Sequence, residues 1–147
     1  MALTKVTSNV LNDDAVTTSK IVDVNVTTGK LADDSVTSAK AGSEFTTATA
    51  LIAGATVALD YTTAQVFTLT PNANTTINIT NPVIGVTKAI VMTGAGGSNT
   101  LAFNVGGAAG TFNKISGDYD DTSATKNFIQ VTCVGATEFW YTISQIG

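Results

Sequence analysis

The sequence contains no histidine and no arginine. Without histidine, a chain cannot form the Ser-His or Cys-His pairs that activate nucleophiles, nor a histidine metal site. Without arginine, it lacks the planar donor group that clamps phosphate. Carboxylate pairs are the remaining route to hydrolysis, but the acidic residues of the later part of the chain fall in or beside expected loops: Asp60, Asp118, Asp120, Asp121 and Glu138. We therefore expect a protein that is not an enzyme and that needs no cofactor, with a calcium ion as the one candidate.

Cysteine is scarce too, since Cys133 stands alone. A single cysteine forms no disulfide within the chain, and without histidine it has no base to activate it. It lies in the apolar stretch 128–134, where strand alternation places it on the same face as Ile129 and Val131. We expect a buried, unreactive thiol.

Charge is low: 12% of residues are charged, and the formal net charge is −4. All the basic residues are lysines, and they are spread singly along the chain. Binding to nucleic acid requires clustered basic side chains that neutralise phosphates. The sequence therefore argues against nucleic acid as a partner.

Long hydrophobic runs are missing, although 44% of residues are hydrophobic and the mean hydropathy is +0.26. The longest candidate, residues 51–59, is interrupted by Gly54 and Thr56 and is far shorter than the roughly 20 residues of a membrane helix. No apolar stretch follows Lys5, so we expect no secretion signal and folding in a cytoplasm. The apolar excess favours contacts between identical subunits, because an obligate interface resembles a domain core.

What the sequence does have is a ten-residue repeat, with units that begin at Met1, Leu11, Ile21 and Leu31. Every unit starts with a bulky apolar residue and has valine and threonine at its sixth and seventh positions. The last three units also have aspartate at the third position and lysine at the tenth. Apolar residues therefore recur every five positions.

This spacing matches neither a continuous helix nor one long strand. Short strands joined by Asp-rich turns fit it better, and a helical turn before each lysine or a disordered polar tail are the alternatives. One chain would leave most of its apolar anchors in water, whereas three chains wound together would bury them. We therefore expect a homotrimeric stalk with these interface residues: Leu11, Val16, Ile21, Val26, Leu31 and Val36.

The repeat stops at residues 41–44, which divides the chain into a stalk, residues 1–43, and a head, residues 44–147. In the head, short stretches with apolar residues at alternate positions are separated by Gly, Asn and Asp, as in strands and turns. The predicted strands are 56–59, 66–70, 75–80, 88–93, 100–105, 112–115, 127–134 and 139–146. With turn signals about every ten residues, the pattern predicts an all-β head built as an antiparallel, jelly-roll-like β-sandwich.

The string Asp-x-x-Val-Thr-Thr/Ser-x-Lys occurs at residues 13–20, 23–30 and 33–40, while the first repeat departs from it and ends in Val10. This string resembles the decad repeats of bacteriophage fibre and tail-fibre proteins. The head, with Asn81-Pro82 after a Thr/Ile/Asn strand and with a final Phe-Trp-Tyr strand, is similar to the small β modules at the ends of such fibres. The resemblance implies a trimeric shaft on the surface of a virion.

Three features of the head are candidate sites. Asp118, Asp120 and Asp121 lie in one turn, where alternating oxygen ligands suit Ca²⁺, although the spacing is not that of an EF-hand. The glycine-rich segment 94–97 lacks the Lys and Ser/Thr of a phosphate loop, so we expect a hairpin turn. Trp140 points away from the expected core, either as a platform for a sugar ring or, as we favour, into the trimer interface.

Together these features predict a structural component of a bacteriophage virion, a homotrimeric fibre or capsid-decorating protein assembled in the host cytoplasm. Its stalk would attach to a capsid or tail protein, and its head would face outward. A second hypothesis is the receptor-binding tip of a tail fibre, which binds a host surface glycan. A third, a fragment of a bacterial adhesin, is disfavoured by the missing secretion signal.

Overall fold

The computed structural model describes residues 17, 21, 27, 31, 32, 35–37 and 40–146. The chain divides into two units, Met1–Thr37 and Ser38–Gly147. In the second unit, one helical turn, α1 (Ser43–Thr46), precedes the strands. These are β1 (Ala48–Ala50), β2 (Thr56–Asp60), β3 (Val66–Leu69), β4 (Thr75–Thr80), β5 (Thr87–Thr93), β6 (Leu101–Val105), β7 (Thr111–Ser116), β8 (Lys126–Cys133) and β9 (Glu138–Ile146).

The prediction of an all-β head is confirmed. Each predicted strand coincides with one of β2 to β9, within one residue at either end, and only β1 was not predicted. The alternation of apolar residues has the expected cause: in β4, Thr75, Ile77 and Ile79 are buried, while the residues between them are partly exposed. Successive side chains of a strand point to opposite faces, so one face of each strand belongs to the core.

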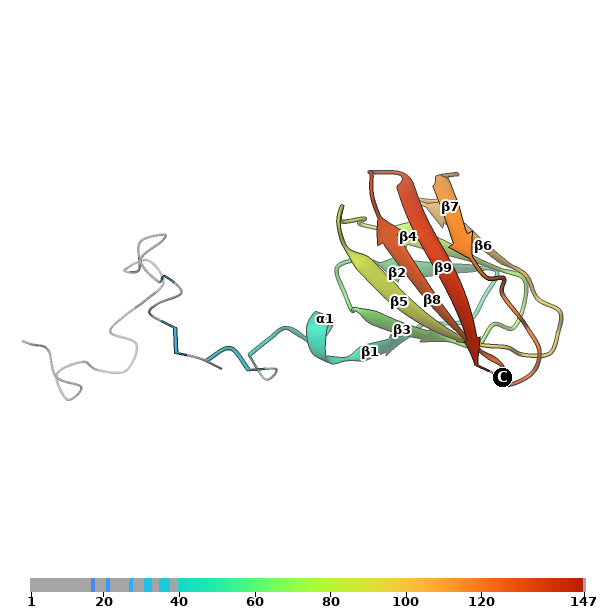
Figure 1. Cartoon of the computed structure of the whole chain (residues 1–147), viewed down its shortest axis with the longest axis horizontal. Coiled ribbons are helices and arrows are strands. Elements are labelled where there is room, and N and C mark those ends of the chain that lie inside the picture. The colour runs from blue at the N-terminus through green and yellow to red at the C-terminus, as the bar shows by residue number, and fades with distance from the viewer. Residues whose placement is uncertain are drawn as a thin grey trace, which may run out of the picture. The chain divides into compact units, whose positions relative to one another are not determined.

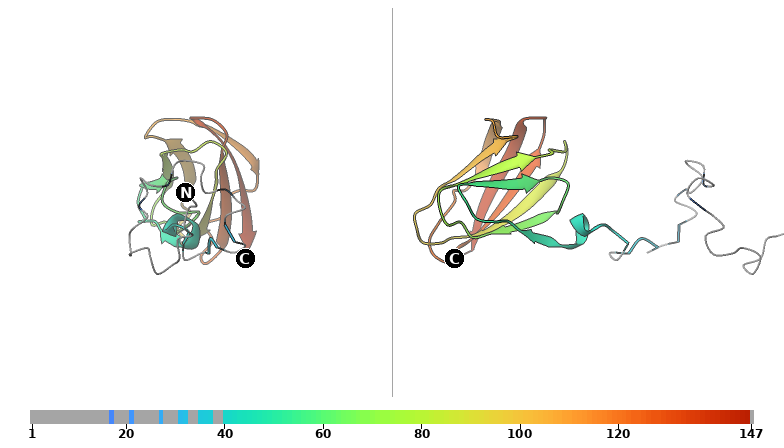
Figure 2. Two further views of the ribbon diagram at one scale, coloured as in Figure 1. Left: turned by 90° about the vertical axis from the view of Figure 1, so that its left-hand side faces the viewer. Right: turned by 180° about the vertical axis from the view of Figure 1, so that it is seen from behind.

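From β1 to β6 the chain winds back and forth between two sheets. β1, β3 and β5 belong to a six-stranded sheet of order β1-β3-β5-β8-β9-β7, and β2, β4 and β6 form a three-stranded sheet. All neighbours among these six strands are parallel, so each successive pair of strands makes one coil of a β-solenoid-like stack. Figure 1 has the larger sheet in front, and the right-hand view of Figure 2 shows the smaller sheet from the other side.

The last two strands interrupt this winding. β8 and β9 form an antiparallel hairpin, which lies between β5 and β7 in the larger sheet. At its turn, the N–H groups of Val134 and Gly135 donate to the carbonyl oxygen of Glu138. β7 is left at the sheet edge, parallel to β9, with a register shift between Lys114 and Ser116.

The predicted antiparallel jelly roll is therefore wrong: of the strand pairs in the described chain, only β5–β8 and β8–β9 are antiparallel. The connections that follow β1 to β5 are corners that carry the chain across to the other sheet, and those after β2 to β5 are rich in polar residues, Gly or Pro. Gly, Asn and Pro permit such a corner as readily as a hairpin. These residues therefore predict that the chain turns, but not whether it crosses to the other sheet or returns beside the preceding strand. The expected hairpin at 94–97 is wrong for the same reason, because it joins β5 and β6 in different sheets.

One core lies between the two sheets. Within each sheet, the strand register aligns inward-facing apolar residues of neighbouring strands in rows. In the smaller sheet, Val57, Ile77 and Phe103 are neighbours in one row. In the larger sheet, one row consists of Phe67, Ile90, Ile129 and Ile143. Aromatic rings close the side of the core near β7: Phe112 stacks on Phe103 at 5.4 Å and on Phe139 at 4.9 Å between ring centres.

Cys133 lies in this core with no exposed surface, and it is a free thiol. Burial raises its pKa, which keeps the unreactive protonated form at neutral pH. The prediction of a buried, unpaired cysteine is confirmed.

Truncation of Ile77 to alanine should test the position of the core. Ile77 has no exposed surface, so Ile77→Ala should lower the free energy of unfolding by about 2–5 kcal/mol in urea titrations. Ile115, which is 64% exposed at the register shift of β7, provides the matched control, and Ile115→Ala should cost less than about 0.5 kcal/mol. Equal losses in the two variants would contradict the described packing.

Candidate functional site

The carboxylate of Asp121 joins the loop between β5 and β6 to the loop between β7 and β8. It accepts hydrogen bonds from the backbone N–H groups of Ala95, Gly97 and Asn99, at 2.9, 3.0 and 2.7 Å. The amide of Asn99 and the hydroxyl of Tyr119 donate to it as well, each at 2.9 Å. Led by the N–H of Ala95, these donors hold the pKa of Asp121 at about 2, against the opposing effect of burial. The ionised carboxylate thus serves as the anchor of the glycine-rich loop.

Gly94 makes this close approach of the two loops possible. A Cβ atom at this position would lie 2.2 Å from the carbonyl oxygen of Thr122, far inside van der Waals contact. The backbone of Gly94 also pairs with the facing loop, donating to the carbonyl of Thr125 and accepting from the N–H of Ala124. The segment 94–97 is therefore rich in glycine because another backbone passes directly beside it.

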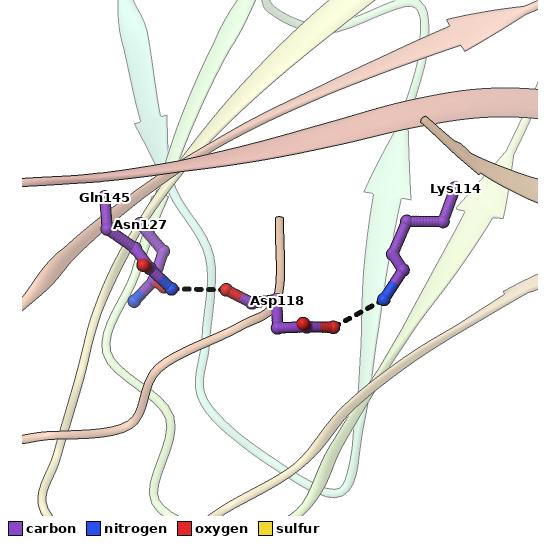
Figure 3. Close-up of polar contacts among 4 residues, drawn as sticks. All are labelled: Lys114, Asp118, Asn127 and Gln145. Carbon is purple, nitrogen blue, oxygen red and sulfur yellow. Dashed lines mark hydrogen bonds and ion pairs between the residues drawn. The ribbon is translucent and has the colours of Figure 1, made fainter. Parts of the chain in front are cut away.

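The neighbouring carboxylates have other partners. Asp118 forms an ion pair with Lys114, and its carbonyl oxygen accepts a hydrogen bond from the amide of Gln145 (Figure 3). Asp120 accepts a hydrogen bond from the N–H of Thr122 at 2.8 Å. Hydrogen bonds from Thr122 lower the pKa of Asp120.

The three residues predicted to hold Ca²⁺, Asp118, Asp120 and Asp121, are therefore committed to separate contacts. A cation at Asp121 would have to displace N–H and O–H donors that point at the same oxygens. Over the part of the chain that the structure describes, no three His, Cys, Asp or Glu side chains are placed to share a metal ion. These contacts give no support to a calcium site.

The same two loops and the end of β9 enclose an open hollow of about 640 Å³, called the loop hollow below. Its size is that of a site for a small ligand. Acceptor oxygens and hydroxyl groups dominate its lining, which suits a ligand with many hydroxyl groups. The lining residues are Gly96, Ser98, Asn99, Asp118, Tyr119, Asp120, Asp121, Thr122, Ser123 and Gln145.

Trp140 lies on β9, on the face of the larger sheet that points away from the core, and it is 48% exposed. Its indole N–H donates to the carboxylate of Glu138 at 3.2 Å, and the amide of Asn113 donates to the same oxygen at 3.1 Å. Both bonds hold the ring of Trp140 beside the β7 edge. It is not among the residues that line the loop hollow.

Of the predicted stalk interface, Leu11, Val16 and Val26 lie outside the described residues. Ile21, Leu31 and Val36 are described, and they are 44%, 47% and 67% exposed. These three bulky apolar side chains therefore have surface that a further chain would be able to cover.

Lys88 is the unusual residue that sequence reasoning missed. It is 2% exposed, on the same face of β5 as Ile90 and Met92, and its ammonium group lies 5.7 Å from the centre of the Tyr61 ring. The Tyr61 hydroxyl donates to the carbonyl oxygen of Val131 at 3.0 Å. The alternation of β5 was the available signal, since it places position 88 inward.

The comparisons with known proteins give no identification. The chain matches no family model, no curated protein and no solved structure. Among the described residues, no helix has the length and apolar character needed to cross a membrane.

Replacement of Asp121 by asparagine should destabilise the protein at neutral pH. The amide side chain would keep one acceptor oxygen and bring an N–H group toward the donors of the loop, so we expect a loss of about 2–3 kcal/mol in the free energy of unfolding. Asp118→Asn is the matched control, because that side chain is 86% exposed, and its loss should stay below about 1 kcal/mol. An Asp121→Asn protein as stable as the control would remove Asp121 as the anchor of the loops.

The pH dependence of stability should report the same carboxylate. Its folded pKa of about 2 lies below the value of about 3.9 expected in the unfolded chain, so its contribution is complete above about pH 4 and declines toward pH 2. In titrations between pH 6 and pH 2, the urea concentration at the unfolding midpoint should therefore decrease as the pH is lowered from about 4 to about 2. The fall should be shallower in Asp121→Asn, and an unchanged slope would contradict the assignment.

Proposed function

We propose that this chain is a structural subunit of a bacteriophage virion, a homotrimeric fibre or capsid-decorating protein. Residues 1–43 form the stalk that attaches to a capsid or tail protein, and residues 44–147 form the head that faces outward on the particle. The observation that carries this proposal is the ten-residue repeat, whose apolar anchors recur at fixed positions.

The exposure of the described anchors supports the self-association of the stalk. Ile21, Leu31 and Val36 keep between 44% and 67% of their surface open in a single chain. Full burial of an exposed side chain of this size contributes about 1.5–3 kcal/mol, so covering the open part of each anchor favours association of the chains. Covering the anchors by identical chains is the simplest way to bury them, because the repeat offers the same spacing to every partner.

A trimer also explains how such a protein works without a catalytic centre. Three heads held on one stalk engage their surroundings together, so weak contacts by each head add up through the effective concentration of its neighbours. The all-β head supplies a rigid carrier for surface residues and loops, here the loop hollow and the face around Trp140.

The full chain should have a solution mass near three times 15.0 kDa, about 45 kDa, in light scattering. Val36→Asp should reduce this mass, because it places a charge on an apolar anchor that three chains bring together. Thr37→Asp is the matched control on the adjacent exposed residue and should leave the mass at about 45 kDa. A monomeric unaltered chain would contradict the trimeric fibre.

A second function is favoured by one observation, the exposed indole ring of Trp140 on the outward face of the larger sheet. Sugars bind to proteins through stacking on aromatic rings and through hydrogen bonds from their hydroxyl groups. The head would then be the glycan-binding tip of a tail fibre.

Because Trp140 is the single tryptophan of the chain, its fluorescence can distinguish the two roles considered for it, trimer interface and sugar platform. If Trp140 lies in the trimer interface, iodide should quench its fluorescence less in the trimer than in a Val36→Asp monomer. If it is a sugar platform, quenching should be strong in both, and Trp140→Ala should abolish binding on an array of bacterial surface glycans. Strong quenching in both proteins without glycan binding would exclude both roles.

A further inference from the structure

The first coil of the head, which we define as β1, the connection 51–55 and β2, is open at its outer side. Ile52 is 90% exposed, and Phe45 in α1, just before the coil, is 65% exposed. Ile52 lines a groove of about 410 Å³ whose lining is mainly apolar: Ala50, Leu51, Ile52, Ala53, Thr56, Val57 and Ala58. This end of the head therefore presents apolar surface to its surroundings.

The groove reaches the core itself. Leu51 and Ala53 are partly buried and pack against the core, and Val57, at 3% exposure, belongs to it. Ile52 lies between Leu51 and Ala53 and has almost all of its surface open. Covering this groove would complete the burial of core residues as well as that of Ile52.

The first coil also ends both sheets. β1 is the edge strand of the larger sheet next to β3, and β2 is an edge strand of the smaller sheet next to β4. Edge strands are commonly protected against pairing by lysine, proline or a bulge. β7, the opposite edge of the larger sheet, has both Lys114 and a register shift, whereas β1 consists only of Ala, Thr and Ala. The larger sheet is thus protected at one edge and open to a partner at the other.

Charge identifies what kind of partner fits. No charged residue occurs from Phe45 to Leu59, so this segment itself offers no ionic partner to a charged peptide or to nucleic acid. For the same reason, nothing on it repels a second copy of the same surface. An uncharged apolar surface with open strand edges is typical of contacts between identical subunits.

The first coil follows shortly after the stalk repeat in the sequence, so association of the stalks places the first coils of different chains near one another. The repeat ends at Lys40, and a fully extended chain covers about 3.4 Å per residue, so Phe45 lies within about 17 Å of Lys40. Wherever three stalks associate, the three Phe45 side chains are therefore held near one another. At that effective concentration, even a weak contact between heads forms.

We infer that the first coils of neighbouring chains contact one another, with Phe45, Ile52 and the edge of β1 as the interface at the base of the heads. The inference rests on the proposed homotrimer, to which it adds the head surface that takes part. The groove along residues 50–58 is filled by apolar side chains of the adjacent copy.

Charge substitutions in the full chain test the interface. Ile52→Asp and Phe45→Asp should each raise at least tenfold the protein concentration at which the trimer dissociates, measured by sedimentation velocity over a dilution series. Ile115→Asp is the matched control, because Ile115 is as exposed as Phe45 but lies on the protected β7 edge, and its dissociation should equal that of the unaltered chain. Equal effects in all three variants would overturn the inference.

Hydrogen–deuterium exchange provides the readout that misfolding would not imitate. In the unaltered trimer, the amides of β1 and β2 should exchange slowly, and in Ile52→Asp they should exchange fast while β5 and β8 stay protected. The inference would be overturned if the protein is a trimer, its β1 and β2 amides exchange fast, and Ile52→Asp does not change its mass. The proposed trimeric fibre would not be affected by that result. A monomeric unaltered chain would overturn both.

Discussion

Parallel register is the constraint on which the rest of this head depends. Because neighbouring coils are stacked in parallel, each inward position meets the equivalent position of the next coil, as Val57 meets Ile77 and Ile77 meets Phe103. Each inward position then needs an apolar residue in every coil, with little demand on which one. The design tolerates a composition of small and β-branched residues, which is what this sequence contains.

The positions of the strands could be predicted because period two is a local property. In β4 and β8, the side chain at every second position is buried, and any reader of the sequence sees this alternation. Strand direction is not local: the corner after β4 contains Asn81 and Pro82, which would equally well suit a hairpin. β1 escaped prediction because Ala48, Thr49 and Ala50 include no bulky apolar residue, and this strand is defined by pairing with β3.

The role of Asp121 shows a different limit of sequence reasoning. An aspartate in an acidic turn is a reasonable ion ligand, and its chemistry gives no other hint. Its actual donors are backbone N–H groups of Ala95, Gly97 and Asn99, which lie 22 to 26 residues earlier in the chain. Backbone groups are the same in every sequence, so only the fold reveals that they converge on one carboxylate. The exposure of Trp140, in contrast, follows from alternation alone.

The hairpin of β8 and β9 has a consequence for the order in which the head is completed. It lies inside the larger sheet although it follows the other strands in sequence, and among the described strands β7 pairs only with β9. During synthesis, β5 therefore has an unpaired edge, and β7 has no strand partner, until β8 and β9 have been made. A chain without the hairpin would expose Ile90 and Met92 of β5 to water and to proteolysis. Closure of the larger sheet therefore depends on β8 and β9, and the apolar side of β5 is fully covered only when this hairpin is in place.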